Sequence, residues 1–366
     1  MRKYWIIVVV SLIMKLSFVF MFPIATEAED MAISSEPLDS VRNDSTHSMV
    51  LASSDIRAGD EVAHWRYVRE IQNTGHPLNV SELWLSGHAT YQASNNPFYY
   101  YVNSLLGTMT QGRLLSVAIS ILALILFASV CYRYSMWWTF LFLAILPASI
   151  ISVSRVGGDC WVYSIVLMMI YAYDQRKHTL LLLLAVLAAN LRMEGLAIAG
   201  IVWLYVCREW FTDWSKVTYL RWLTILASAT TIVTALLIYV DRLPLLRSGH
   251  SFNSVSLESL FGMQNGLNQA FISLWFHVGN EKYFSLWFLL VPAILLSWIF
   301  TKRFYTIACD TFRDNWAIVL IVLITVGIFV ASTFSQTASC GRYLLNFIPW
   351  MAYLIYKEQH KTSAVA

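Results

Sequence analysis

Residues 113–132 read RLLSVAISILALILFASVCY, and a stretch of this kind decides the fold. An α-helix rises 1.5 Å per residue, so about 20 apolar residues cross the ~30 Å hydrocarbon core of a bilayer. Comparable apolar runs recur along most of the chain. The pattern predicts an all-α polytopic membrane protein.

The composition agrees with this class. The chain is 58% hydrophobic, 15% aromatic and only 13% charged, far from the usage of soluble domains. Its net charge of +3 does not indicate nucleic-acid binding, because the basic residues stand singly or in pairs beside apolar runs. The five cysteines form no C-x-x-C pair, so neither a disulfide framework nor a metal module is expected.

The apolar runs predict about ten transmembrane helices. The first covers roughly residues 5–23 after the basic pair Arg2 and Lys3, and its length favours an uncleaved helix over the alternative, a cleaved signal peptide. The others are expected at 113–132, 136–154, 160–174, 178–191, 194–211, 219–240, 284–300, 316–334 and 343–356. The expected divisions are a first helix (1–24), an outer loop (25–112), a nine-helix bundle (113–357) with a second outer loop (241–283), and a cytoplasmic tail (358–366).

Alternating spans place the basic residues on one side, which the positive-inside rule makes the cytoplasm. The large first loop then lies on the outer face. Within it, Val62, Trp65, Val68 and Ile71 recur at helical spacing, and residues 73–77 end that helix with Gly and Pro. A tyrosine-rich stretch from 96 to 109 predicts a second helix at the membrane interface.

The first of these helices opens with the pair Asp60 and Glu61, followed by His64. Adjacent carboxylates on a helix diverge by about 100°, so they do not form one dyad. An acidic first turn is also what the helix dipole favours without any function. Asp60 and His64 share a helical face, which permits a metal site but does not establish one.

Further candidates stand where the membrane runs meet the outer face. Asp159 follows a Gly-Gly turn and is either a helix cap or a carboxylate whose pKa desolvation would raise. Arg192 and Glu194 lie between two spans. They either form an ion pair, with each other or with another helix, or bind substrate. Arg342 opens the last span and either snorkels to lipid phosphates or holds a phosphate in a site.

Two more features remain open from the sequence. Lys15 lies inside the first span, where it snorkels, pairs with a carboxylate, or marks a shorter helix. Cys160 and Cys340 both fall on the outer side, next to Asp159 and near Arg342, and a disulfide between them is a side hypothesis.

The ordered set of motifs resembles the C-type superfamily of multi-spanning glycosyltransferases. Residues 59–68, GDEVAHWRYV, are similar to a "P-D-E-P-A-H-F-R-Y" stretch of bacterial members, and residues 91–101, YQASNNPFYYY, to their "Y-x-A-x-x-P-P-L-Y-Y" element. Gly157-Gly158-Asp159 stands where they carry an "N-N-D" turn, and residues 341–345, GRYLL, match their "G-R-Y-L-L-P". The chain departs from the pattern at Asn96, at the Gly-Gly turn and at Asn346.

The resemblance implies transfer of a sugar from a polyprenyl-phosphate donor to a lipid, glycan or protein acceptor at the outer face of a membrane, with a bacterial inner membrane favoured. It implies Asp60 as the base, Asp159 as a second catalytic carboxylate, and Arg342 on the departing phosphate. The expected substrate-binding residues are Glu61, His64, Tyr99, Tyr100, Arg192, Glu194, Arg342 and Tyr343. The sequence establishes no cofactor and leaves metal dependence open; Asp60 and Asp159 are the candidate ligands if the reaction uses a divalent cation.

Two other classes remain as alternatives. A transporter or flippase would show internal repeats and broken helices at the midplane, and the two long outer loops share no motif. A catalytically inactive assembly subunit with the same fold is compatible with the departures from the family pattern.

Overall fold

The structure is a computed structural model that describes residues 1–21, 58–76, 97–146, 149–150, 158–212, 218–249, 313–327 and 341–365. These residues form helices and no strand, which confirms the all-α class for the described part of the chain. The helices are α1 (Arg2–Met21), α5 (Ala58–Thr74), α8 (Pro97–Ser104), α9 (Met109–Arg133), α10 (Trp137–Ile145), α12 (Gly158–Asp174), α13 (His178–Ala189), α14 (Met193–Phe211), α15 (Tyr219–Gly249) and α19 (Gly341–Val365). Residues 313–327 are also helical.

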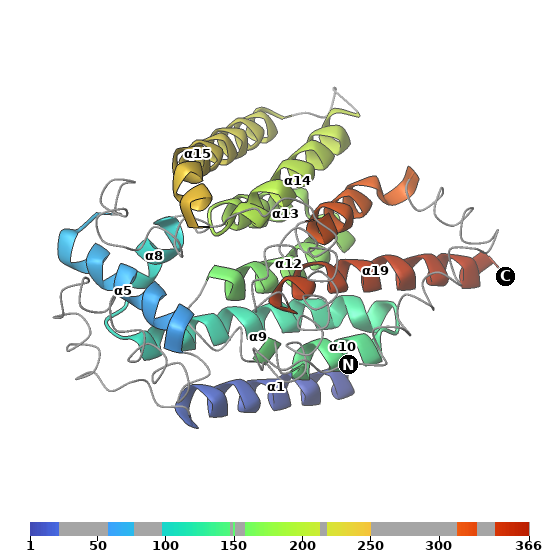
Figure 1. Cartoon of the computed structure of the whole chain (residues 1–366). Coiled ribbons are helices and arrows are strands. Elements are labelled where there is room, and N and C mark those ends of the chain that lie inside the picture. The colour runs from blue at the N-terminus through green and yellow to red at the C-terminus, as the bar shows by residue number, and fades with distance from the viewer. Residues whose placement is uncertain are drawn as a thin grey trace, which may run out of the picture.

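Helix α9 is the central element of the bundle. It begins at Met109, four residues before the apolar run, because Thr108 and Gln111 form a capping box there. Helices α1 and α12 pack on either side of it (Figure 1). Helix α1 runs antiparallel to α9, because Tyr4 contacts Cys131 and Lys15 contacts Ser120, whereas α12 runs parallel to it, because Trp161 contacts Ser116 and Asp174 contacts Arg133. Side chains that lock this arrangement include Tyr4, whose hydroxyl donates to the Cys131 carbonyl at 3.0 Å.

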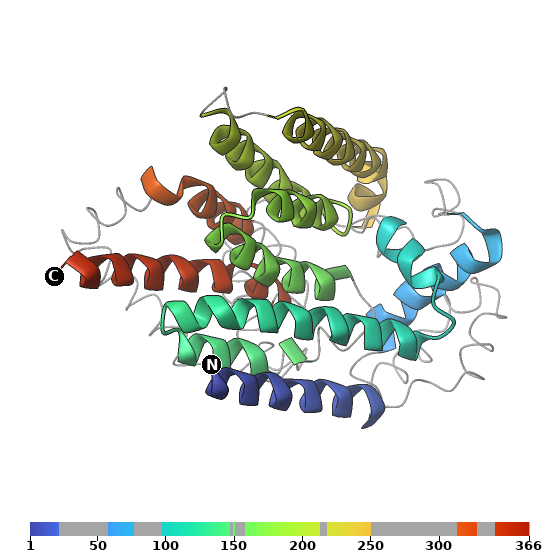
Figure 2. The ribbon, with the colours of Figure 1, turned by 180° about the vertical axis from the view of Figure 1, so that it is seen from behind.

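Three helices in the described part are long and apolar enough to cross a membrane: Arg2–Phe20, Met109–Arg133 and Tyr219–Val240. Two shorter apolar helices, Trp161–Asp174 and His178–Ala189, pack among them. Helices α13, α14 and α15 form a further layer that covers α12 (Figure 2). The chain is therefore a helical membrane protein, and the number of ten spans stays a prediction because residues 284–300 lie outside the described part.

Several helix boundaries differ from those that the apolar runs predict. The run 136–154 is interrupted, because Leu146 precedes a proline and adopts ψ 128°, outside the helical region. Helix α15 continues to Gly249, past the expected loop start at 241, although this segment contains Pro244, a residue that disfavours a helix interior. Helix α19 continues through the expected tail to Val365.

The bundle has two different ends. Helices α5 and α8 lie at one end, here called the α5 end, and both chain termini lie at the other (Figures 1 and 2). At this other end, the Asp174 end, the carboxylate of Asp174 accepts hydrogen bonds from Arg133 at 2.8 Å, from the Tyr134 hydroxyl at 2.7 Å and from the Tyr353 hydroxyl at 3.2 Å. Burial, together with the hydrogen bond to Asp174, raises the pKa of Tyr134 to about 12.

Basic side chains gather at the Asp174 end. Several of them lie over aromatic rings: Lys3 over Trp137, Arg208 over Trp316 and Lys357 over Tyr173. By the bounds of their helices and by these contacts, the described basic residues at this end are Arg2, Lys3, Arg133, Arg176, Lys177, Arg208, Arg221, Arg313 and Lys357. This is the clustering that the positive-inside rule associates with a cytoplasmic face.

Candidate functional site

The candidate site lies at the α5 end, where helix α5 rests on α8. The face of α5 that carries Trp65, Val68 and Ile71 is buried, as its helical spacing predicts. The helix ends at Thr74, followed by Gly75 at φ 74°, a left-handed conformation that costs glycine little. This confirms the helix that residues 60–77 predict.

The contact between α5 and α8 combines one aromatic pair with one amide. The rings of Tyr67 and Tyr100 meet edge to face with their centroids 4.3 Å apart, and both rings are fully buried. The amide nitrogen of Gln72 donates to the carbonyls of Ser104 and Leu106 at 3.0 and 2.7 Å, and so satisfies the end of α8. The two helices therefore form one unit.

A chain of aromatic rings continues from this unit to the start of α12. Tyr100 packs against Tyr99 at 5.3 Å, and Tyr99 packs against Trp161 at 5.1 Å. The Trp161 indole N–H donates to the Ser116 hydroxyl of α9 at 3.0 Å. Helices α5 and α8 and the first turn of α12 are thus fixed to the same end of α9.

Lys15 lies one layer deeper, between α1 and α9. Its side chain is fully buried, and Nζ donates to the Ser120 hydroxyl at 2.8 Å. Among the described residues Lys15 has no carboxylate partner. A buried amine inside an apolar bundle is costly unless an anion or several acceptors compensate it, so this position is a candidate for binding a negatively charged group.

A second buried cation, Arg113, lies on the same face of α9, with 2% of its surface exposed. Positions 113, 116 and 120 are one or two helical turns apart, so Arg113, Ser116 and Ser120 form a polar line along the apolar helix. Seven residues correspond to about 10 Å of rise, roughly the separation of the two cations along the axis of α9. We call Lys15, Arg113, Ser116, Ser120 and Trp161 the Lys15 track.

The turn between α13 and α14 carries a buried ion pair. Arg192 Nε and Nη2 donate to the two carboxylate oxygens of Glu194 at 3.1 and 3.2 Å, and both residues are buried. Helix α13 is only 12 residues long, about 18 Å, so the pair lies within the depth of a bilayer core. Arg192 and Glu194 therefore form an ion pair with each other, one of the alternatives that the sequence allows. Removing one partner of a buried ion pair is strongly destabilising, because the other charge stays buried without its counter-charge.

Glycine is required beside this pair. A Cβ built on Gly195 would lie 2.0 Å from the carbonyl oxygen of Ala188, since the end of α13 passes directly over α14. At Gly200, five residues further along α14, an added Cβ meets nothing within 4 Å. The close approach at Gly195 fixes the turn that holds Arg192 and Glu194.

The sequence-predicted site residues divide into three groups. Tyr99 and Tyr100 are fully buried in the aromatic chain, and Arg192 and Glu194 pair with each other. Backbone positions are described for the first turns of α5, α12 and α19, but their predicted side chains, and the Cys160–Cys340 disulfide, lie outside what the structure describes. These side chains are Asp60, Glu61, His64, Asp159, Arg342 and Tyr343.

No family model, curated protein or solved structure matches the chain. The functional argument therefore rests on the residues themselves. Within the described residues no group of three His, Cys, Asp or Glu side chains is placed to hold a metal ion. The polar side chains of the Lys15 track are cationic or donate and accept through a hydroxyl or an indole N–H, and this combination suits binding of an anion.

Sequence reasoning missed Arg113, because it reads as the first residue of an apolar run and therefore as a charge at the membrane surface. The signal that identifies it is the repetition of polar residues at 113, 116 and 120, three and four residues apart, in an otherwise apolar helix. Lys15 was noticeable from the sequence, but its partner Ser120 lies 105 residues away in the chain.

Proposed function

We propose that the chain is a membrane glycosyltransferase that moves a sugar from a polyprenyl-phosphate donor to an acceptor hydroxyl at the outer face. In this reaction the acceptor oxygen attacks the anomeric carbon and the bond from that carbon to the phosphate oxygen breaks. Asp60 accepts the proton of the acceptor hydroxyl, and the lipid leaves as a phosphate monoester. Attack opposite the leaving group inverts the configuration at the anomeric carbon.

The observation that carries the proposal is the fully buried Lys15, which has a hydroxyl but no carboxylate as its described partner. An amine held in an apolar bundle is best compensated by an anion that enters through the membrane. A lipid-linked phosphate is such an anion, because its polyprenyl chain keeps it within the bilayer. Arg113 adds a second buried positive charge on the same face of α9.

The arrangement of helices supports the roles of the carboxylates. The rings of Tyr67, Tyr100, Tyr99 and Trp161 connect α5, which begins with the Asp60 motif, to α12, which begins with Asp159. Both helices therefore meet at the end of the bundle that holds the Lys15 track. In the proposed reaction Asp159 positions the acceptor or a divalent cation, and Arg342 acts with Lys15 and Arg113 on the departing phosphate.

The proposed orientation follows from charge. Most of the described basic residues lie at the Asp174 end, so in this proposal that end faces the cytoplasm and the α5 end faces outward. In a bacterial inner membrane the α5 end would lie on the periplasmic side. With about ten spans, the alternating arrangement puts both termini in the cytoplasm.

The proposal is tested with the purified full chain in nanodiscs. Labelled polyprenyl-phosphate hexoses and pentoses are supplied with membrane extracts as acceptors, with and without a chelator, and transfer of label is measured. We expect transfer by the wild type and loss of at least about 100-fold for Asp60→Asn and for Arg342→Ala. Gly200→Ala serves as a control that keeps activity, because this position has open space and lies outside the proposed site. Undiminished transfer by both site variants would contradict the assignment.

A further inference from the structure

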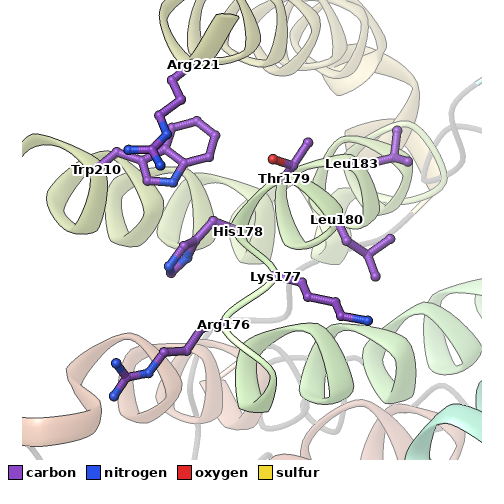
Figure 3. A pocket seen from close by; sticks show the side chains of 8 residues that line it. All are labelled: Arg176, Lys177, His178, Thr179, Leu180, Leu183, Trp210 and Arg221. Carbon is purple, nitrogen blue, oxygen red and sulfur yellow. The ribbon is translucent and has the colours of Figure 1, made fainter. Parts of the chain in front are cut away.

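A pocket of about 620 Å³ lies at the Asp174 end, opposite the proposed active site, because its residues Arg176 to His178 directly follow α12. Figure 3 shows the side chains that line it. It is formed where the turn after α12 meets the start of α13, the end of α14 and the start of α15. Its lining is Arg176, Lys177, His178, Thr179, Leu180, Leu183, Trp210 and Arg221. Four of these eight side chains carry or can gain a positive charge, and none is acidic.

The cations are arranged around an aromatic side chain. Arg221 reaches from α15 toward Trp210, with its guanidinium 5.6 Å from the ring centre (Figure 3). Lys177 donates to the Tyr171 hydroxyl at 2.9 Å. The exposed Arg176 side chain has no ion pair among the described residues, and Glu209 on the end of α14 is the acid whose charge acts on His178. Positive charge exceeds negative charge here.

The start of α13 offers hydrogen-bond donors to an anion. Its N-cap residue, Lys177, makes no side-chain capping hydrogen bond. The N–H groups in the first turn of α13 therefore lack the acceptor that an N-cap side chain usually supplies. Next to them, the Nδ1 atom of His178 is buried and has no hydrogen-bond partner among the residues that the structure describes. A buried polar atom without a partner calls for an explanation, and a bound ligand in the pocket supplies one.

The backbone at Arg176 is in the left-handed region, at φ 53°. Lys177 N–H bonds to the Ala172 carbonyl at 2.8 Å and Arg176 N–H to the Tyr173 carbonyl at 3.1 Å, so α12 ends in a Schellman motif. Glycine is the usual residue at this position, because other residues are strained there. Arg176 therefore places its side chain beside the pocket, and the strained backbone at this position lowers the stability of the protein.

Two leucines of α13 extend the lining of the pocket beyond the basic residues. Leu180 and Leu183 follow the basic residues by one and two turns of α13, and Leu183 is 56% exposed. Trp210 lies at the boundary, where tryptophan is favoured in membrane proteins. A ligand that fits has an anionic head at the start of α13 and an apolar chain along these leucines.

We infer that this pocket binds the phosphate head of an anionic phospholipid from the leaflet at the Asp174 end. The basic and aromatic residues surround the headgroup, and Leu180 and Leu183 contact an acyl chain. Basic pockets between transmembrane helices at this depth are suited to such lipids. The inference does not depend on the proposed transfer reaction, because no lining residue belongs to the α5 end.

Arg176→Gly is the decisive variant, because it removes the guanidinium and relieves the left-handed strain at once. Native mass spectrometry of the full chain in mild detergent measures binding of phosphatidylglycerol, of phosphatidylcholine with the same acyl chains, and of glycerol phosphate. We expect the wild type to prefer phosphatidylglycerol and Arg176→Gly to bind it about fivefold more weakly. Adding Lys177→Gln should bring the loss to about 25-fold.

Ser135→Gly is the matched control. Ser135 has φ 58° at the end of α9, in a second Schellman motif, and is not part of the pocket. Both glycine variants should unfold at a temperature no lower than the wild type, yet only Arg176→Gly should lose lipid. Unchanged phosphatidylglycerol binding by the double variant of Arg176 and Lys177 would overturn the inference. So would equal binding of phosphatidylcholine, or glycerol phosphate binding as tightly as the lipid.

Discussion

Replacing Lys15 by methionine separates a functional role for this residue from a structural one. Methionine has a similar length and no charge, so it can fill the space between α1 and α9. If Lys15 is there to bind an anion, its removal should stabilise the empty protein and impair the reaction. If Lys15 holds the bundle together, its removal should destabilise the protein.

The magnitude follows from the surroundings of the side chain. A charged lysine in the middle of a membrane helix costs about 2.5–3.5 kcal/mol, and one hydrogen bond between membrane helices returns about 0.6–1.7 kcal/mol. Lys15 is fully buried and has a single described hydrogen bond, 2.8 Å to Ser120. Lys15→Met should therefore raise the free energy of unfolding by about 1–3 kcal/mol, while losing one cation on the departing phosphate slows transfer by about 100-fold.

The assay is reversible unfolding in mixed micelles with increasing SDS, followed by circular dichroism, alongside the transfer assay. Ser120→Ala is the matched variant: it keeps the amine but removes its acceptor, so it should lower the free energy of unfolding by about 1 kcal/mol. Opposite signs for the two variants are the expected result. A Lys15→Met protein that is less stable by 1 kcal/mol or more, with activity reduced only in proportion to its folded fraction, would refute the reasoning.

Three further predictions concern the rest of the bundle. Gly195→Ala should destabilise the protein by about 3 kcal/mol or more in thermal unfolding, because the new methyl group clashes with a backbone carbonyl. Gly200→Ala should leave the stability unchanged or raise it by up to about 1 kcal/mol. Glu194→Ala should cost about 3–5 kcal/mol in SDS unfolding by leaving Arg192 buried without its carboxylate; a loss below 1 kcal/mol would mean that the pair contributes little. Because the pKa of Tyr134 is raised in the folded state to about 12, its neutral form stabilises the fold below about pH 10, and this contribution is lost as the pH rises to 12. The stability difference between wild type and Tyr134→Phe should shrink across that interval, and a constant difference would contradict the shift.

Local patterns predicted the helices best. The spacing of Trp65, Val68 and Ile71 gave the buried face of α5, and Gly75 gave its end, since these signals depend only on neighbours along the chain. Length alone was less informative: the run from 136 is cut short by the residue before a proline, because the ring excludes the helical conformation there. Apolar content does not encode such backbone restrictions.

The site was harder to predict because its contacts are distant in sequence. Tyr99 and Tyr100 carry the aromatic signal expected of a binding surface, yet their rings are buried and connect α8 to α5 and α12. Arg113 reads as a surface charge, and its burial depends on how helices from elsewhere in the chain cover α9. The same limit applies to the end of α19, which continues past its apolar run. There Lys357 donates to Asn315 at 2.7 Å, a contact between residues that are distant in the sequence.

The measurement that tests the central claim most directly is single-turnover transfer with the purified chain and a labelled polyprenyl-phosphate sugar. The wild type should release the lipid phosphate and pass the label to an acceptor with inverted configuration, and Asp60→Asn should abolish both steps while Gly200→Ala keeps them. Release of lipid phosphate by Asp60→Asn at the wild-type rate, or transport of the intact lipid-linked sugar without cleavage, would contradict the account.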